Sequence, residues 1–321
     1  MIRTAGSNPA FSIVLLAVLC GVSLAAQPAG GRGPQTTYWV AKGKGGVYVA
    51  PNHPLTRLAD LKARHTGQAV WKELVVKDPE IQAEYNAAVT GTVFSPRFHP
   101  DTASVAVVVE GEMRFEIEGQ SPILASRGSI VNILKGTLYS FEITGSRSGL
   151  WVEINPVNFQ TLYPANIPLP VVPGGMEMVQ VAFSRAPLAY AAPNLPHWNL
   201  FEAAKKGPPG GARVAQDHLF LNPIYGFAEP NYGGAAPFNP QSIFGHMHPG
   251  PAEWWIVQSG QITAKFENAG EFVGSEGDIL YAPPMTWHQM GFRGAGPSCR
   301  LAIGAYSFIN MNSTPGGTAD R

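Results

Sequence analysis

Short runs rich in β-branched and aromatic residues recur along the chain and end at glycines. The first series, up to residue 154, contains SVAVVVEG, MRFEIEG, SIVNIL, LYSFEI and LWVEI. These residue types favour strands and glycine favours turns, so the series predicts a set of short strands. A second series begins at MVQVAFS, residues 178–184, and continues toward residue 310. The pattern predicts two successive all-β regions.

Three short helices are expected between the strands. Residues 55–64 have apolar positions at helical spacing, and a further helical stretch lies around residues 200–205. Residues 79–89 follow Asp78, a suitable N-cap, and begin with a proline, which favours a first helical turn. Residues 163–175 are rich in proline and glycine and predict a connection between the two β regions.

The composition agrees with many strands joined by tight turns. The chain has 36 Gly, 29 Pro and only 14% charged residues, which disfavours a helical bundle. Lys and Arg number 22, as do Asp and Glu, so no net charge attracts nucleic acid or an acidic membrane surface. We expect a small-molecule substrate or ligand as the partner, and the sequence sets no oligomeric state.

The N-terminus resembles a secretory signal peptide. Arg3 precedes the apolar residues 11–19, and small residues follow at Ala25 and Ala26, where cleavage is expected. The apolar run is too short to span a membrane. We therefore expect residues 1–26 to be removed and the mature chain to be periplasmic or extracellular, without a membrane span. Cleavage leaves Cys299 as its sole cysteine, so the mature chain has no internal disulfide.

The two β regions match each other at a fixed offset. Gly260 corresponds to Gly111, Gly277 to Gly128 and His248 to His99, each 149 residues apart. Such a period indicates two copies of one β-domain. We place the first domain at residues 38–160 and the second at residues 176–310.

Three histidines and a glutamate in the second copy form a candidate metal site. His246 and His248 are two residues apart, so on a strand both point to the same side. Glu253 follows after a turn, and His288 comes from a later strand. Three imidazoles and a carboxylate suit one divalent transition metal, whether Fe, Mn, Ni, Cu, Co or Zn, and leave room for a water or a substrate.

These residues resemble the two sequence motifs of the cupin family, and the repeat resembles a bicupin. His246, His248, Glu253 and Gly260 match the first motif, and Gly277, Pro283 and His288 match the second. Three positions depart from the motifs, where Pro240, Met285 and Phe292 replace two glycines and an asparagine. The resemblance implies two tandem jelly-roll β-barrels with a few short helices, over roughly residues 38–310.

The first copy lacks this ligand set. At the same offset it has Arg97, His99, Ser104 and Tyr139 in place of the four ligands. A fixed cation, one imidazole and neutral hydroxyls do not suit a divalent metal. We expect the first barrel to be a scaffold, with an anion pocket at Arg97, His99 and Tyr139 as the alternative, because guanidinium and phenol both donate to carboxylates.

Strand alternation predicts the surroundings of the metal site. If Glu253 and His288 face inward, Trp255 and Met290 do too, whereas Trp254 and Trp287 face out. Phe266 and Tyr281 are further candidates for the pocket lining. Residues 229–242, rich in Gly, Pro and Asn, precede the first ligand strand and predict a lid or a surface loop.

The resemblance implies a metal-dependent oxidoreductase of the dioxygenase type, acting on a phenolic or enolisable substrate. In this reading the substrate binds the metal at an open position, and Glu253 takes a proton as the catalytic base. An oxalate-decarboxylase-like enzyme, another metal-assisted lyase or isomerase, and a non-catalytic metal or ligand-binding protein are the alternatives. Oxalate decarboxylases have the ligand set in both barrels, unlike this chain.

Overall fold

A computed structural model describes residues 38–168, 170, 175–192, 194–206, 214–215, 219–226, 245–294, 296–305 and 309–312. The described residues from Ala41 onward belong to one compact unit. The predicted signal peptide and the predicted lid, residues 229–242, lie outside the described residues. None of the described helices is long and apolar enough to cross a membrane.

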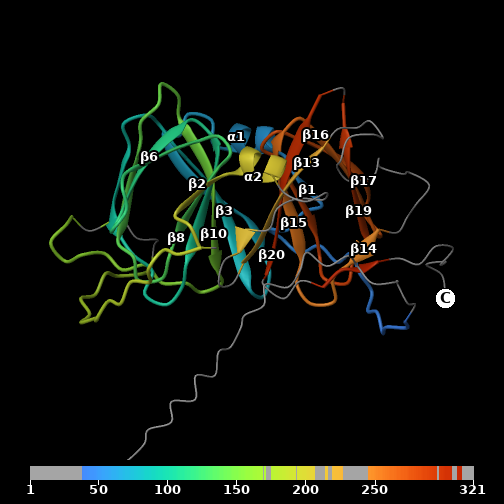
Figure 1. The fold of residues 1–321 in the computed structure, drawn as a ribbon, viewed down its shortest axis with the longest axis horizontal. Coiled ribbons are helices and arrows are strands. Elements are labelled where there is room, and N and C mark those ends of the chain that lie inside the picture. Colours follow the sequence, from blue (N-terminus) through green and yellow to red (C-terminus); the bar gives the residue numbers. More distant parts are fainter. Residues whose placement is uncertain are drawn as a thin grey trace, which may run out of the picture. The chain divides into compact units, whose positions relative to one another are not determined.

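The first β region forms two antiparallel sheets, coloured blue to green in Figure 1 apart from β11. The six-stranded sheet has the order β11 (His197–Asn199), β8 (Ser129–Ile133), β5 (Ser104–Glu110), β10 (Gly149–Pro156), β3 (Ile81–Ala88) and β2 (Val70–Lys77). The four-stranded sheet has the order β4 (Val93–Arg97), β9 (Tyr139–Ile143), β6 (Glu112–Ile117) and β7 (Ile123–Ser126).

The second β region repeats this arrangement, with most of its strands orange to red in Figure 1. Its six-stranded sheet has the order β1 (Leu55–Thr56), β18 (Ile279–Ala282), β15 (Glu253–Ser259), β20 (Ser298–Ala305), β13 (Leu219–Gly226) and β12 (Val214–Ala215). Its five-stranded sheet has the order β17 (Gly270–Ser275), β16 (Gln261–Phe266), β19 (His288–Arg293), β14 (His246–Met247) and β21 (Met311–Asn312). The nearly all-β architecture is that of two jelly-roll barrels, as the sequence predicts.

Two short strands cross between the barrels. β1 precedes every strand of the first barrel in sequence but pairs with β18 of the second. β11 follows the first barrel in sequence and pairs with β8, at the edge of the first barrel's sheet. Each barrel therefore depends on a segment outside its predicted residue range.

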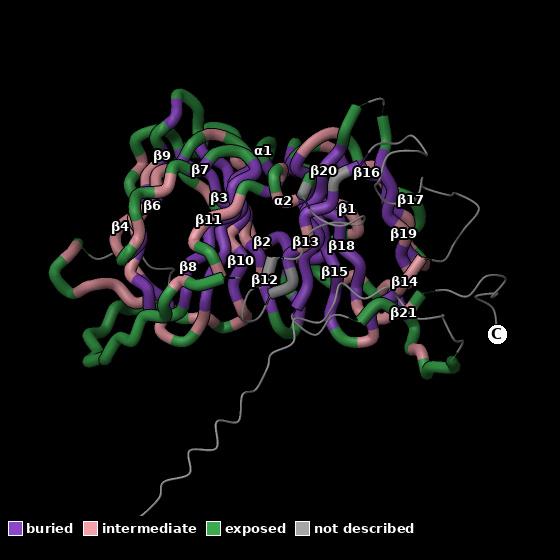
Figure 2. Tube along the Cα trace, viewed as in Figure 1, coloured by how far each residue is buried: buried purple, intermediate pink, exposed green. Residues whose placement is uncertain are grey.

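The central strands of the six-stranded sheets, β5, β10, β15 and β20, bury both faces, which divides the hydrophobic residues into three clusters. On β15, Trp255 and Val257 belong to a cluster within the second barrel, whereas Trp254 and Ile256 belong to a cluster shared by both barrels. A third cluster, which includes Phe115 and Trp151, fills the first barrel. Figure 2 shows these sheets largely buried. The shared cluster explains why β15 has four consecutive apolar residues, Trp254 to Val257.

Polar contacts also join the barrels. Asp278, in the turn before β18, accepts a hydrogen bond at Oδ1 from the backbone N–H of Leu58, at 2.9 Å. That bond fixes the start of α1 (Leu58–Arg64) against the second barrel. The Tyr85 hydroxyl of β3 donates to the carbonyl of Gly277. Arg127 donates to the carbonyl of Gln258, with its Nη2 at 2.6 Å.

The predicted helices are only partly correct. α2 (Leu200–Lys206) lies where a helix was expected, and α1 begins three residues later than predicted. The helix predicted at residues 79–89 is wrong, because β3 occupies this segment. Asp78 does accept backbone hydrogen bonds from Glu80 and Ile81, at 2.8 and 2.7 Å, but in a turn between β2 and β3. Pairing of β3 with β2 and β10 outweighs the local helix signal. The strand predicted at residues 178–184 is also wrong, because this segment is irregular.

Candidate metal centre

Three strands of the second barrel bring the predicted ligands together. His246 lies on β14 directly opposite His288 on β19. Gly245 allows this close approach, because a Cβ there would collide with the carbonyl of His288. His248 follows β14, and Glu253 is the first residue of β15. The turn between them returns the chain so that the carboxylate faces the imidazoles.

The four side chains converge on one point. Glu253 Oε2 lies 2.8 Å from His248 Nε2, 2.9 Å from His288 Nε2 and 3.4 Å from His246 Nε2. The Nε2 atoms of His246 and His288 are 3.1 Å apart. All four ligand atoms lie within 4.8 Å of one another.

Burial differs across the cluster. The side chains of His248, Glu253 and His288 are at most 7% exposed, whereas that of His246 is 27% exposed. The cluster therefore opens to solvent on the His246 side. A small molecule approaching the centre would come from that side.

Backbone carbonyls orient two of the imidazoles. His248 Nδ1 lies 3.0 Å from the carbonyl of Ile309, and His288 Nδ1 lies 2.9 Å from the carbonyl of Thr286. A carbonyl only accepts hydrogen bonds, so both Nδ1 atoms carry the proton. The Nε2 atoms of both rings then face the centre.

The ionisation of the cluster favours a bound cation. Burial, partly opposed by the bond to Glu253, lowers the pKa of His288 to about 4, so this ring is neutral near pH 7. Burial alone would raise the pKa of Glu253, but its contacts with the three imidazoles outweigh burial and hold that pKa well below its usual range. A carboxylate thus faces three imidazole nitrogens, an arrangement that a positive ion at the centre stabilises. Ligands about 2.1 Å from a metal are about 3 Å apart when adjacent, so the observed spacing fits a transition metal.

Aromatic and apolar side chains line the barrel beside the centre. The rings of Trp255 and His288 are 5.3 Å apart, and Phe266 packs against Trp255 at 6.1 Å. Met290 belongs to the same cluster, as strand alternation predicts. Tyr281 does not: it belongs to the cluster shared by the barrels, because Leu280 and Ala282 take the inward positions of β18. Tyr281 is therefore excluded from the pocket lining.

A buried arginine inside the same barrel escaped the sequence interpretation. Arg300 lies on β20, its guanidinium is 4.8 Å from the centre of the Phe292 ring, and burial lowers its pKa to about 10. Its Nε and Nη1 atoms are buried without a hydrogen-bond partner. Alternation in SCRLAIG could have found it, since Cys299 and Leu301 face the other barrel and Arg300 must face inward. The guanidinium covers the ring of Phe292, which stands at one of the positions that depart from the motif.

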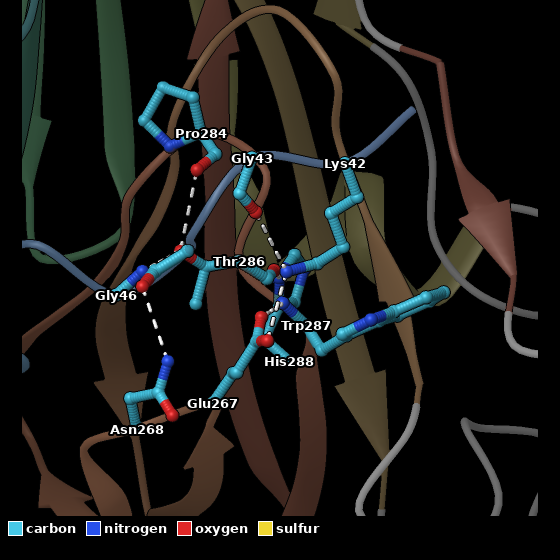
Figure 3. A network of polar contacts seen from close by, with 10 residues as sticks. Lys42, Gly43, Gly46, Glu267, Asn268, Pro284, Thr286, Trp287 and His288 are labelled. Carbon is cyan, nitrogen blue, oxygen red and sulfur yellow. Dashed lines mark hydrogen bonds and ion pairs between the residues drawn. The ribbon is translucent and has the colours of Figure 1, made fainter. Parts of the chain in front are cut away.

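Residues 42–46 also contact the centre's surroundings, which the sequence did not predict (Figure 3). Lys42 pairs with Glu267 at 2.9 Å, and Gly46 N–H donates to the Thr286 hydroxyl at 2.8 Å. Thr286 is the residue whose carbonyl orients His288. The contacts join positions more than 220 residues apart, so no local pattern indicates them.

The corresponding positions of the first barrel form a hydrogen-bonded group without a metal-ligand set. Arg97 Nε donates to the Tyr139 hydroxyl at 3.2 Å, and His99 Nε2 lies 3.1 Å from the same hydroxyl. The Arg97 guanidinium also lies 5.0–5.5 Å from the centres of three aromatic rings, those of Phe94, Tyr139 and Phe141. Ser104 is buried on β5. The structure brings Arg97, His99 and Tyr139 together, and anion binding by them stays a prediction.

Comparisons with known proteins agree with this fold. The cupin domain family matches residues 238–304, which contain all four predicted ligands. No curated protein matches the sequence. A variant of oxalate decarboxylase from B. subtilis is similar in structure, with a TM-score of 0.50, 14% identity, and coverage of 87% of this chain and 81% of that one.

Salicylate 1,2-dioxygenase from Pseudaminobacter salicylatoxidans is similar with a TM-score of 0.56 and 11% identity, over 78% of this chain and 83% of that one. A variant of the same enzyme in complex with gentisate gives a TM-score of 0.56 and 11% identity, over 78% and 81%. At these identities the likeness establishes the fold.

Proposed function

Because the chain is a bicupin with three imidazoles and a carboxylate converging in its second barrel, we propose that it is a metal-dependent oxidoreductase of the dioxygenase type. The substrate class is a small phenolic or enolisable compound. His246, His248, Glu253 and His288 hold one divalent transition metal. The observation that carries the proposal is the position of Glu253 Oε2, within 3.4 Å of all three Nε2 atoms.

A bound metal would supply Lewis acidity and, if it is redox-active, would allow the substrate to react with oxygen. The chain's own residues bind and orient the substrate. Trp255 and Phe266 are buried beside His288 and form an apolar wall behind the centre. Glu253 is ionised and, on loosening from the metal, its carboxylate would be free to take the proton of the substrate's hydroxyl or enol.

The fold likeness to salicylate 1,2-dioxygenase, seen also in complex with gentisate, supports a planar hydroxy-acid substrate. The test is oxygen uptake by protein loaded separately with Fe, Mn, Ni, Cu, Co or Zn and supplied with gentisate, salicylate or related phenols. Uptake by at least one redox-active form, absent from His288→Ala, is expected. No uptake with any metal and any substrate of the class would contradict the proposal.

A lyase or isomerase is the second candidate, and the likeness to oxalate decarboxylase favours it. Its mark is turnover under nitrogen, with oxalate as the first substrate to test. The first barrel weighs against an oxalate decarboxylase, since Arg97, Ser104 and Tyr139 replace its ligands.

A non-catalytic protein that binds a small ligand or stores metal is distinguished by Glu253→Gln. A binding protein would retain most of its affinity, because three imidazoles still hold the metal. An enzyme that uses Glu253 as a base would bind substrate and lose turnover.

We also propose that the protein is exported, on the basis of residues 1–26 alone. Cell fractionation with N-terminal sequencing of the recovered protein tests this. A mature N-terminus after Ala25 or Ala26 is expected. Full-length protein confined to the cytoplasm would contradict it.

A further inference from the structure

Residues 42–46, here called the N-terminal strap, lie against the loop that ends at the metal ligand His288 (Figure 3). We propose that Lys42 and Gly45 of the strap are positioning residues, which hold this loop so that the Nε2 lone pair of His288 faces the metal centre. The inference rests on the proposed metal binding. The strap comes from the chain before the first barrel, so the second barrel's site is completed from outside its own repeat.

Gly45 packs where no side chain fits. A Cβ at this position would lie 2.7 Å from the carbonyl oxygen of Met285 and 2.7 Å from Glu267 Oε2. Such distances are too short, so any side chain must displace the strap or the loop. Gly43, two residues earlier, would meet nothing within 4 Å. The chain therefore offers a matched pair of glycines, one buried against the loop and one free of it.

Lys42 acts through Glu267. Its ammonium pairs with Glu267 Oε1 at 2.9 Å, while Glu267 Oε2 accepts the backbone N–H of Trp287 at 3.0 Å. The backbone N–H of Glu267 donates to the carbonyl of Trp287 at 2.8 Å. The two carboxylate oxygens thus link the strap to the residue directly before His288. Lys44, exposed on the same strap, serves as the control for a lost lysine charge.

The loop transmits these contacts to two ligands. Gly46 N–H holds the Thr286 hydroxyl at 2.8 Å, and the Thr286 carbonyl accepts the Nδ1 proton of His288. Met285 N–H donates to the carbonyl of His248 at 2.8 Å. A loop released from the strap no longer fixes the Thr286 carbonyl, so His288 can turn or change tautomer. Outer groups that orient ligating histidines typically change metal affinity 10–100-fold.

The first measurement is the affinity of chelator-treated protein for Co²⁺, followed by visible absorption. Lys42→Met and Gly45→Ala are each expected to weaken binding about tenfold. Lys44→Met and Gly43→Ala are expected to match the wild type, and Lys42→Arg to restore affinity. Thermal unfolding of the metal-free variants separates a local from a global effect. Unchanged affinity in both strap variants, or losses that follow metal-free stability across all variants, would overturn the inference.

The second measurement needs no metal. Nitrogen-15 NMR of metal-free protein near pH 7.5 reports the tautomer of His288. We expect a protonated Nδ1, bonded to the Thr286 carbonyl, in the wild type and both controls, and a mixture of protonated and unprotonated Nδ1 in Lys42→Met and Gly45→Ala. If the wild type binds no Co²⁺, the proposed function fails and the tautomer decides the inference. A pure Nδ1–H form in every variant would then overturn it.

Discussion

The two barrels carry opposite charges at the corresponding sites. At the inner end of the second barrel's ligand strands, Glu253 and three imidazoles face one another and favour a cation from outside. At the equivalent place in the first barrel, the guanidinium of Arg97 supplies a cation from the chain itself. It is bonded to Tyr139 and surrounded by aromatic rings.

The difference shows how a repeated site can lose a metal and keep its fold. Tyr139 donates to His99 Nε2, whose Nδ1 in turn lies 3.1 Å from the carbonyl of Gln160. The first barrel's donors and acceptors are thus paired with each other. A metal would have no convergent lone pairs to bind there.

The two barrels also differ in charge at a second pair of corresponding positions. Trp151 of the first barrel packs against Phe94 and Phe141, whereas Arg300, 149 residues later, carries a charge in the second. Arg300 is buried, whereas Arg97 of the first barrel is half-buried.

The largest expected effect is the restoration of the missing site. With His99 kept, the triple variant Arg97→His, Ser104→Glu, Tyr139→His recreates the ligand set at the same offset. We expect metal content to rise from about one to about two equivalents per chain, by elemental analysis of metal-loaded protein. A folded triple variant that still binds one equivalent would show that the barrels differ in more than these residues.

The shared cluster predicts that the barrels unfold together. Ile256 is fully buried in it, so Ile256→Ala should lower the free energy of unfolding by about 3 kcal/mol. Chemical denaturation followed by fluorescence and by circular dichroism should give one coincident transition. Two separate transitions, with only the second barrel weakened, would contradict a common core.

A pH dependence should belong mainly to the second barrel's site. The folded pKa of His288 is about 4, below its usual value, because burial disfavours the charged ring. As pH falls below about 6.5, the unfolded chain takes up a proton at this residue and the folded chain does not. Stability of metal-free protein should therefore fall between pH 6.5 and 4.5, by at most about 1.4 kcal/mol per unit.

The control for this dependence is His288→Ala, which removes the titrating ring. Its denaturation curves should show a shallower slope with pH over the same window. An equal slope in the variant would assign the effect to other groups, such as His99, whose pKa burial also lowers.

The first barrel's internal cation should contribute to stability without affecting metal. Arg97→Ala removes the bond to Tyr139 and the contacts with three rings, at a cost of about 2 kcal/mol. Exposed Arg147→Ala should cost less than about 0.5 kcal/mol. Metal content should be unchanged in both variants. A loss of metal from Arg97→Ala would mean that the barrels are coupled.

The smallest effect concerns a departure from the cupin motif. Met285 stands where the motif has glycine and has a φ of 59°, a left-handed conformation that costs about 1–2 kcal/mol for a residue with a side chain. Met285→Gly relieves this strain but loses chain entropy on folding, for a net gain of about 0.5 kcal/mol. Thermal unfolding measures it, and a clear loss of stability would show that the Met285 side chain contributes packing.

The sequence was sufficient for features that depend on the internal repeat and on strand alternation. The offset of 149 residues predicted two barrels, and alternation on β15 placed Trp255 inward and Trp254 outward. The spacing of His246, His248, Glu253 and His288 predicted a cluster that the structure forms.

The sequence failed where distant contacts decide. Residues 79–89 have good helix signals, but pairing with β2 and β10 makes them a strand. Tyr281 does not line the pocket, because neighbouring residues of β18 face opposite sides and Leu280 faces inward. The ion pair of Lys42 with Glu267 spans 225 residues, and no pattern in one sequence reveals it.

Elemental analysis of the mature protein shows whether the second barrel binds a metal. The protein is purified without added metal or tag histidines and analysed by elemental mass spectrometry beside a His246→Ala, His288→Ala double variant. We expect about one equivalent of a transition metal per chain in the wild type, and its loss in the double variant. No metal in either protein after reconstitution, or equal metal in both, would contradict it.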